Sequence, residues 1–119
     1  MERIDLGGLV EEQLAKARAG TAGRSAVTIH GGRESVMRQT VVALREGAGL
    51  DAHDSPGEAT LQVLRGRIRF TTLGGGPETS TELAAGEYAV LPPQRHAVAA
   101  LDEAAILLTV GLHEGAALG

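Results

Sequence analysis

The sequence predicts a single all-β domain, a sandwich or barrel, with one amphipathic α-helix at its N-terminus. The chain has 119 residues, the usual length of one domain. From residue 24 onward, short runs rich in Val, Ile, Leu and Thr alternate with glycine turns, a pattern typical of all-β folds. Before that point apolar residues recur at helical spacing. We therefore expect a helix and linker over residues 1–23 and a β-barrel domain over 24–119.

The composition excludes several classes of protein. Hydrophobic residues make up 43% of the chain and charged residues 22%, which is ordinary globular composition. The net charge of -4 argues against a nucleic-acid-binding protein, which needs a basic face. The chain has no Cys, which excludes disulfides and thiolate metal sites. The longest apolar run, residues 104–112, is too short to span a membrane, and the N-terminus lacks the apolar segment of a signal peptide, so we expect a cytoplasmic protein without membrane partners.

The expected helix covers residues 5–19. Its apolar side chains fall on one face. Acidic residues lie in its first half, and Lys16 and Arg18 lie in its last turn, which is the favourable arrangement for the helix dipole. Gly20 is a natural residue at which the helix ends. The polar face mixes both signs of charge, so packing on its own domain or on a partner subunit is favoured over membrane binding.

The strand pattern that follows is regular. Each segment is short, rich in β-branched and aliphatic residues, and bounded by glycine or proline. Residues 74–77 (GGGP) predict a hairpin turn, because glycine tolerates positive φ and proline ends strand pairing. The expected strands are 25–30, 35–46, 60–64, 67–73, 79–83, 87–91, 96–100 and 105–112.

Two stretches of the β region carry a more specific pattern. Residues 47–66 read GAGLDAHDSPGEATLQVLRG and resemble the first cupin motif, G-x5-H-x-H-x3,4-E-x6-G. Residues 86–96 read GEYAVLPPQRH and are similar to the start of the second motif, G-x5-P-x-G-x2-H-x3-N. The motifs and their spacer cover nearly half the chain. The resemblance to small single-domain cupins implies a cupin-like jelly-roll barrel, and it also implies a homodimer.

The resemblance further implies a metal held by two His and a Glu of the first motif and the His of the second. H-x-H spacing places both imidazoles on one face of a strand. Aligned without gaps, His53 matches the first His, whereas Ser55 and Ala59 stand at the second His and the Glu. In the second motif His96 comes one residue early.

A second alignment uses Asp51 and His53 as the pair and Glu58 as the carboxylate, which leaves seven residues rather than six before Gly66. A one-residue shift reverses the face of every side chain in a strand, so the two alignments disagree about Glu58, and a bulge near Pro56-Gly57 would reconcile them. The candidate metal ligands are therefore His53, His96, Glu58 and Asp51, for Fe, Mn, Ni or Zn.

Three functions are compatible with these residues. The first is a barrel that binds a small molecule, as a sensing or accessory module without catalysis, through His53, Gln62, Tyr88 and His96. The second is a metal-dependent enzyme of the oxygenase or isomerase type that uses His53 and His96. The third is a regulatory partner that uses the helix and the arginines at 65, 67 and 69, which alternate as if on one strand face. Two imidazoles alone are few ligands for a divalent metal, and this favours the first function, a barrel that binds a small molecule.

Overall fold

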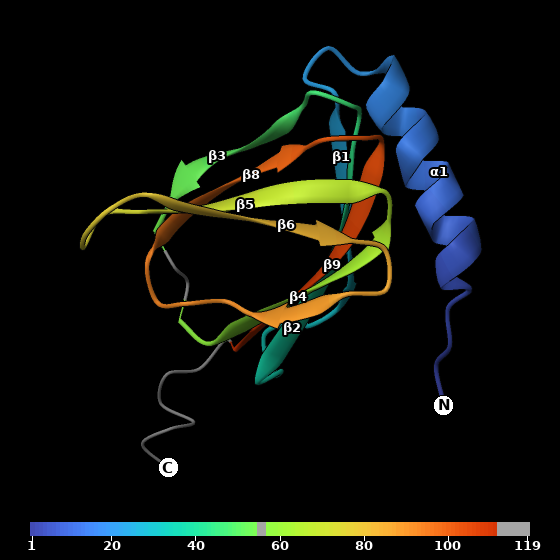
Figure 1. Ribbon diagram of the computed structural model, residues 1–119. Coiled ribbons are helices and arrows are strands. Elements are labelled where there is room, and N and C mark those ends of the chain that lie inside the picture. Colours follow the sequence, from blue (N-terminus) through green and yellow to red (C-terminus); the bar gives the residue numbers. More distant parts are fainter. Residues whose placement is uncertain (55–56, 112–119) are drawn as a thin grey trace.

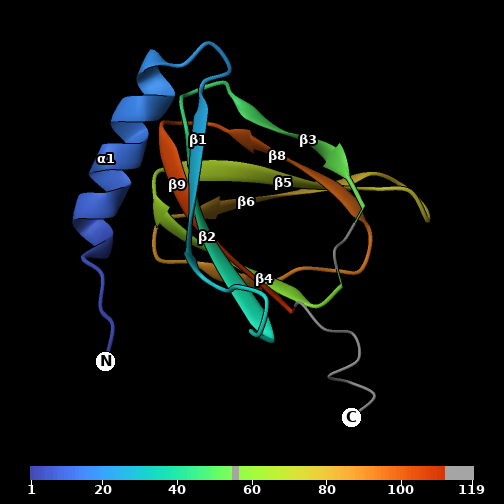
Figure 2. The same ribbon diagram turned by 180° about the vertical axis from the view of Figure 1, so that it is seen from behind.

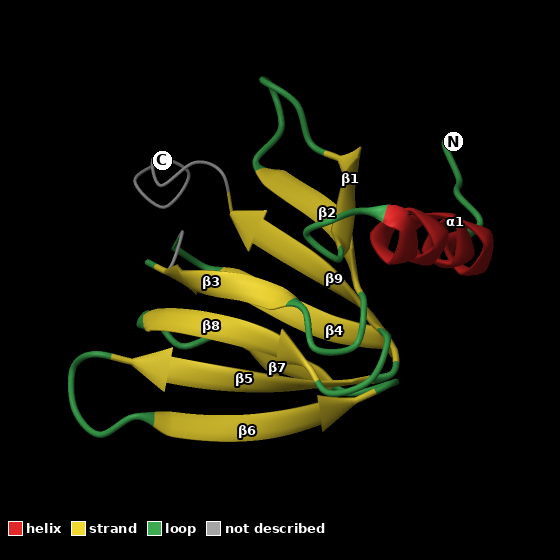
Figure 3. Cartoon of the chain, turned by 90° about the horizontal axis from the view of Figure 1, so that it is seen from above, coloured by secondary structure: helices red, strands yellow, loops and turns green. Residues whose placement is uncertain are grey.

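The computed structural model of the chain describes residues 1–54 and 57–111 and consists of one helix and two antiparallel sheets (Figure 1). The five-stranded sheet has the order β1-β2-β9-β4-β7 and the four-stranded sheet the order β3-β8-β5-β6. The two sheets pack face to face as a jelly roll (Figure 3). The elements are α1 (Leu6–Ala19), β1 (Arg24–His30), β2 (Met37–Leu44), β3 (Gly49–His53), β4 (Ala59–Arg65), β5 (Arg67–Leu73), β6 (Thr79–Ala84), β7 (Tyr88–Val90), β8 (Arg95–Ala100) and β9 (Ala104–Gly111).

The core between the sheets follows the alternation of each strand. In β4 the side chains of Leu61 and Val63 are fully buried while Gln62 between them is exposed, because successive side chains of a strand point to opposite faces. Ile68 of β5 and Ile106 of β9 complete the interior from the two sheets. The core is aliphatic except for Phe70.

The helix covers part of the outer face of the five-stranded sheet, beside β1 and β2 (Figure 2). Val10, Leu14 and Ala17 of α1 form a second buried cluster with residues of β2 and β9, including Val41 and Ala105. Among the described residues, no helix has the length and apolar character needed to cross a membrane.

Polar contacts fix the helix in place. The guanidinium of Arg18 pairs with the carboxylate of Glu103 at 2.5 Å, and Arg65 pairs with Glu11. The buried Gln13 accepts a hydrogen bond of 2.5 Å from the hydroxyl of Ser25. These contacts set the position of α1 along the sheet, while the buried apolar side chains supply the stabilisation, since exposed ion pairs contribute little.

Most of the strand pattern is confirmed, including the β5–β6 hairpin, whose turn holds Gly74, Gly75 and Gly76 at positive φ. Two expectations are wrong. The strand β3 was not predicted at all. The three arginines do not share one strand face, because Gly66, with φ of +73°, makes a turn after Arg65. Arg65 ends β4, whereas the other two lie on β5 and pair with Glu82.

Candidate functional site

Two histidines of the cupin-like motifs meet across neighbouring strands. His53, the last residue of β3, is opposite His96 of β8. Their ring centroids lie 4.4 Å apart with an interplanar angle of 70°, an edge-to-face contact. His96 is buried, with 3% of its surface exposed, while His53 is exposed. The structure thus brings together the motif histidines from two segments that are distant in the sequence.

A β-bulge in β3 brings the two imidazoles into contact. Leu50 pairs with Val98 and His53 pairs with His96, so three residue steps on β3 match two on β8. In an unbroken strand, residues three apart would point to opposite faces. The extra residue of a bulge reverses the alternation, which lets Leu50 pack against the core and His53 meet His96 on the same side of the sheet.

Each imidazole is oriented by a backbone carbonyl. Nδ1 of His53 lies 2.9 Å from the carbonyl oxygen of Asp51, and Nδ1 of His96 lies 3.0 Å from that of Gln94. A carbonyl only accepts, so both Nδ1 atoms carry the proton, and in the neutral rings Nε2 is left as an acceptor. Burial lowers the pKa of His96, the Gln94 carbonyl raises it in part, and the nearby His53 lowers it further.

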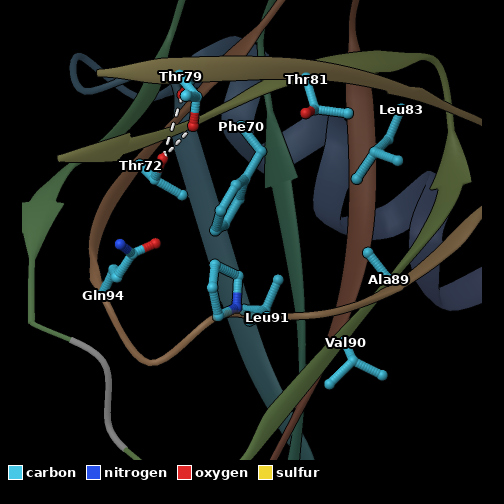
Figure 4. Close-up of a pocket in the computed structure, with 10 residues that line it drawn as sticks. Phe70, Thr72, Thr79, Thr81, Leu83, Ala89, Val90, Leu91 and Gln94 are labelled. Atoms are coloured by element: carbon cyan, nitrogen blue, oxygen red, sulfur yellow. Dashed lines mark hydrogen bonds between the residues drawn. The ribbon is translucent and has the colours of Figure 1, made fainter. Parts of the chain in front are cut away.

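Phe70 connects the histidines to a cavity. Its ring stacks on His96 with centroids 4.8 Å apart and an interplanar angle of 29°. The same side chain lines a cavity of about 290 Å³ (Figure 4). The cavity lies where the edge strands β6 and β7 of the two sheets face each other, and it is lined by Phe70, Thr72, Thr79, Thr81, Leu83, Ala89, Val90, Leu91, Pro92 and Gln94.

The cavity has a polar end and an apolar end. In Figure 4 the side chains of Thr72, Thr79 and Gln94 lie together on one side of Phe70, and Leu83 lies on the other, with Thr81 between it and Phe70. The hydroxyls of Thr72 and Thr79 are hydrogen-bonded to each other. The lining residues carry no formal charge. The cavity is therefore a neutral, amphipathic compartment.

Other predicted site residues lie elsewhere. Asp51 and Glu58 are exposed. Gln62 and Tyr88 are paired across β4 and β7, and both are exposed, on the outer face opposite to the buried Leu61. Neither lines the cavity. The sequence analysis missed the lining residues of β5 and β6, which carry no motif. The other lining residues lie inside the second motif (residues 86–96), and that position was the signal available, namely for Ala89, Val90, Leu91, Pro92 and Gln94.

The residues present do not fit a protein-held divalent metal. Structural and catalytic sites use three or four protein ligands, yet among the described residues no group of three or more His, Cys, Asp or Glu is close enough to hold an ion. His53 and His96 supply two imidazoles, and the exposed Asp51 and Glu58 do not join them. Ser55, at the second His of one alignment, lies outside the described residues, as does the expected bulge position Pro56.

Comparisons with known proteins identify the fold. Neither a scan against protein-family models nor a search of the curated proteins gives a match. A search of solved structures finds a cupin superfamily protein from Desulfitobacterium hafniense, with a TM-score of 0.62 and 12% identity over 75% of this chain and 79% of that one. The chain has the cupin fold.

Two other solved structures are also similar to this chain. A conserved protein of unknown function from Streptococcus pyogenes matches with a TM-score of 0.66 and 25% identity, over 80% of this chain and 79% of that chain. A salicylate 1,2-dioxygenase variant from Pseudoaminobacter salicylatoxidans matches with a TM-score of 0.73 and 19% identity, over 98% of this chain but only 36% of that chain. At these identities the likeness establishes the cupin fold, and cupins of one fold carry unrelated functions.

Proposed function

We propose that this cupin binds a small organic molecule in the cavity between β6 and β7, as a sensing or accessory module without catalysis. The observation that carries the proposal is the cavity itself, about 290 Å³ in volume, with apolar walls and a few hydrogen-bonding groups. That combination is typical of ligand sites, whose volumes run from about 300 to 1,000 Å³. The ligand is therefore small, about the size of a single substituted ring.

The proposal is tested by filling the cavity. Ala89 is half-buried and lines it, so Ala89→Leu places extra carbon atoms in the space that a ligand would occupy. Ala99→Leu is the matched control, because Ala99 is an exposed residue of β8. Benzyl alcohol, a neutral single-ring probe, is titrated into each isotope-labelled protein and followed by NMR of the backbone amides.

In the unaltered protein, we expect benzyl alcohol to cause saturable chemical-shift changes at the amides of the cavity residues. In Ala89→Leu, the affinity for benzyl alcohol should fall at least tenfold. The Ala99→Leu control should bind as the unaltered protein does. Well-dispersed spectra show that each variant is folded. Absence of shifts at the cavity, or equal binding by the folded Ala89→Leu variant, would contradict the proposal.

A metal-dependent enzyme of the oxygenase or isomerase type is the second candidate. The observation in its favour is the pair of Nδ1 atoms tied to carbonyls, since metal-ligating His usually donates its other ring N–H in this way. One structural neighbour, oxalate decarboxylase from Bacillus subtilis, has Mn(II) centres. For Fe, Mn, Ni or Zn, however, the described residues of this chain supply too few ligands.

We also propose that the chain forms a homodimer. Support comes from large apolar side chains on its surface, among them Val36 at 63%, Tyr88 at 60% and Val90 at 67% exposure, which association would remove from water. Light scattering at micromolar concentration should give about twice the chain mass of 12.2 kDa. A single species at the chain mass would contradict this.

A further inference from the structure

We infer that the ligand of this cavity is uncharged and amphipathic, with a head group that both donates and accepts hydrogen bonds at Gln94 and an apolar ring against Phe70 and Leu83. This inference rests on the proposed function and adds the chemical class of the ligand. It follows from three features of the cavity, namely its charge, its polar end and its apolar end.

The cavity offers no counter-ion. None of its lining residues is charged, and Arg95 and Glu82, which are next to lining residues in the chain, are paired with other side chains, while Glu78 beside Thr79 is exposed. Arg95, beside Gln94, pairs with Asp54 at 3.2 Å and donates to the carbonyl of Ala52 at 3.2 Å. Glu82, between two lining residues of β6, pairs with Arg67 and Arg69 at 3.4 and 3.5 Å. A charged ligand would lose hydration here without gaining an opposite charge, which is costly.

The polar end offers a ligand both a donor and an acceptor at Gln94, an exposed residue at the rim of the cavity. The side-chain amide of Gln94 has an oxygen that accepts and an NH₂ group that donates, and among the described residues it forms no side-chain hydrogen bond. The backbone of Gln94 is held, because its carbonyl accepts the hydrogen bond of His96. The hydroxyls of Thr72 and Thr79 are hydrogen-bonded to each other, and the Thr72 hydroxyl also donates to the backbone carbonyl of Thr79 at 3.4 Å, so what this pair offers a ligand is the lone pairs of its oxygens.

The apolar end suits a ring. One face of the Phe70 ring is occupied by His96, and the side chain also borders the cavity, where Figure 4 shows it between Gln94 and Leu83. Aromatic rings gain from offset or edge contacts beyond the area that they bury. Leu83 and Leu91 supply aliphatic contacts on either side. A ring at this end would place a substituent at Gln94.

Three probes that share a phenyl ring and differ in the charge of its substituent test the inference. Benzamide is neutral, with both donor and acceptor; benzoate is the isosteric anion; benzylammonium is the cation. Each is titrated by NMR into the unaltered protein, into Gln94→Leu and into Gln62→Leu. The last is the matched control, because Gln62 is exposed on the outer face and does not line the cavity.

We expect benzamide to bind at least tenfold more tightly than either ion. Gln94→Leu should weaken benzamide about tenfold, the effect of losing one or two hydrogen bonds, and Gln62→Leu should leave it unchanged. If benzoate or benzylammonium bound at the cavity more tightly than benzamide, the inference would be overturned while the proposed function stood. Unchanged benzamide binding by Gln94→Leu would have the same consequence. Binding of benzyl alcohol that Ala89→Leu does not weaken would instead overturn the proposed function.

Discussion

The imidazoles of His53 and His96 meet edge to face, 4.4 Å apart, because a bulge in β3 turns His53 toward β8. Both rings have Nδ1 beside a backbone carbonyl, so Nδ1 is the donor of each ring and, in a neutral ring, Nε2 is left as an acceptor. A cupin barrel in which two imidazoles lack a third ligand, next to a neutral cavity, is better suited to hold an organic molecule than a divalent ion.

The metal content of the purified protein follows from this ligand count. We expect elemental mass spectrometry of tag-free protein, incubated with Fe, Mn, Ni or Zn and then desalted, to find far less than one metal per chain, because two imidazoles bind a divalent ion weakly. His53→Ala and His96→Ala should give the same low value. One metal per chain, lost in both variants, would establish a working metal site and revive the enzyme hypothesis.

Stability should depend on pH through His96. The pKa of His96 in the folded state is lowered below 6.5, and burial is the largest cause of this shift. Below pH 6.5 the unfolded chain therefore binds the proton more readily than the folded chain does. The free energy of unfolding should therefore fall as the pH drops below 6.5. Urea denaturation at about pH 7.5 and about pH 5.5 measures the fall, which His96→Gln should reduce.

The matched control for this pH dependence is His30→Gln, since His30 is an exposed residue at the end of β1. This substitution should leave unchanged the difference in the free energy of unfolding between the two pH values. NMR titration of the His96 ring gives its pKa directly, and a midpoint at or above 6.5 would show that burial does not govern this group.

The helix should be an integral part of the folded domain. Leu14 is fully buried between α1 and the outer face of the sheet. Leu14→Ala should lower the free energy of unfolding by about 2–5 kcal/mol, through lost burial and the cavity left behind. Glu12→Ala, at an exposed position of the same helix, should change it by less than about 0.5 kcal/mol. An equally small loss in Leu14→Ala would mean that the helix is not packed on the barrel in solution.

The turn between β4 and β5 should require glycine. Gly66 has φ of +73°, and a Cβ there would collide with the backbone carbonyl of Glu103. Gly66→Ala should therefore destabilise the fold by about 1–3 kcal/mol or more. Gly32→Ala is the control, since a Cβ there meets nothing within 4 Å, and it should be neutral or slightly stabilising. Equal melting temperatures for both variants would contradict the turn geometry.

The strands that the sequence predicts well are those whose alternation is unbroken. In β4 and β5 every second residue is buried, and this period of two is visible in the sequence. The strand β3 was missed because its bulge places Leu50 and His53 on the same side of the sheet, three residues apart, which breaks that period. The arginine face was wrong for a related reason, because the alternation of the three arginines was continued across Gly66, where the chain turns.

The candidate site was only partly accessible from the sequence. His53 and His96 lie in recognisable motifs, so their meeting could be anticipated. The cavity could not, because side chains such as Thr72, Thr79 and Thr81 are unremarkable in their own segments and become part of a site only when β6 and β7 face each other. Gln62 and Tyr88 lie in the right strands but on the outer face, which the register of β4 and β7 decides.

The most direct test of the central claim, an uncharged ligand in this cavity, is a crystal structure of the protein with benzamide. We expect the ring of benzamide between Phe70 and Leu83, its carboxamide within hydrogen-bond distance of the Gln94 amide, and no metal density at the imidazoles. An empty cavity with benzamide bound elsewhere, or a metal ion on His53 and His96 with water completing its coordination, would contradict the account.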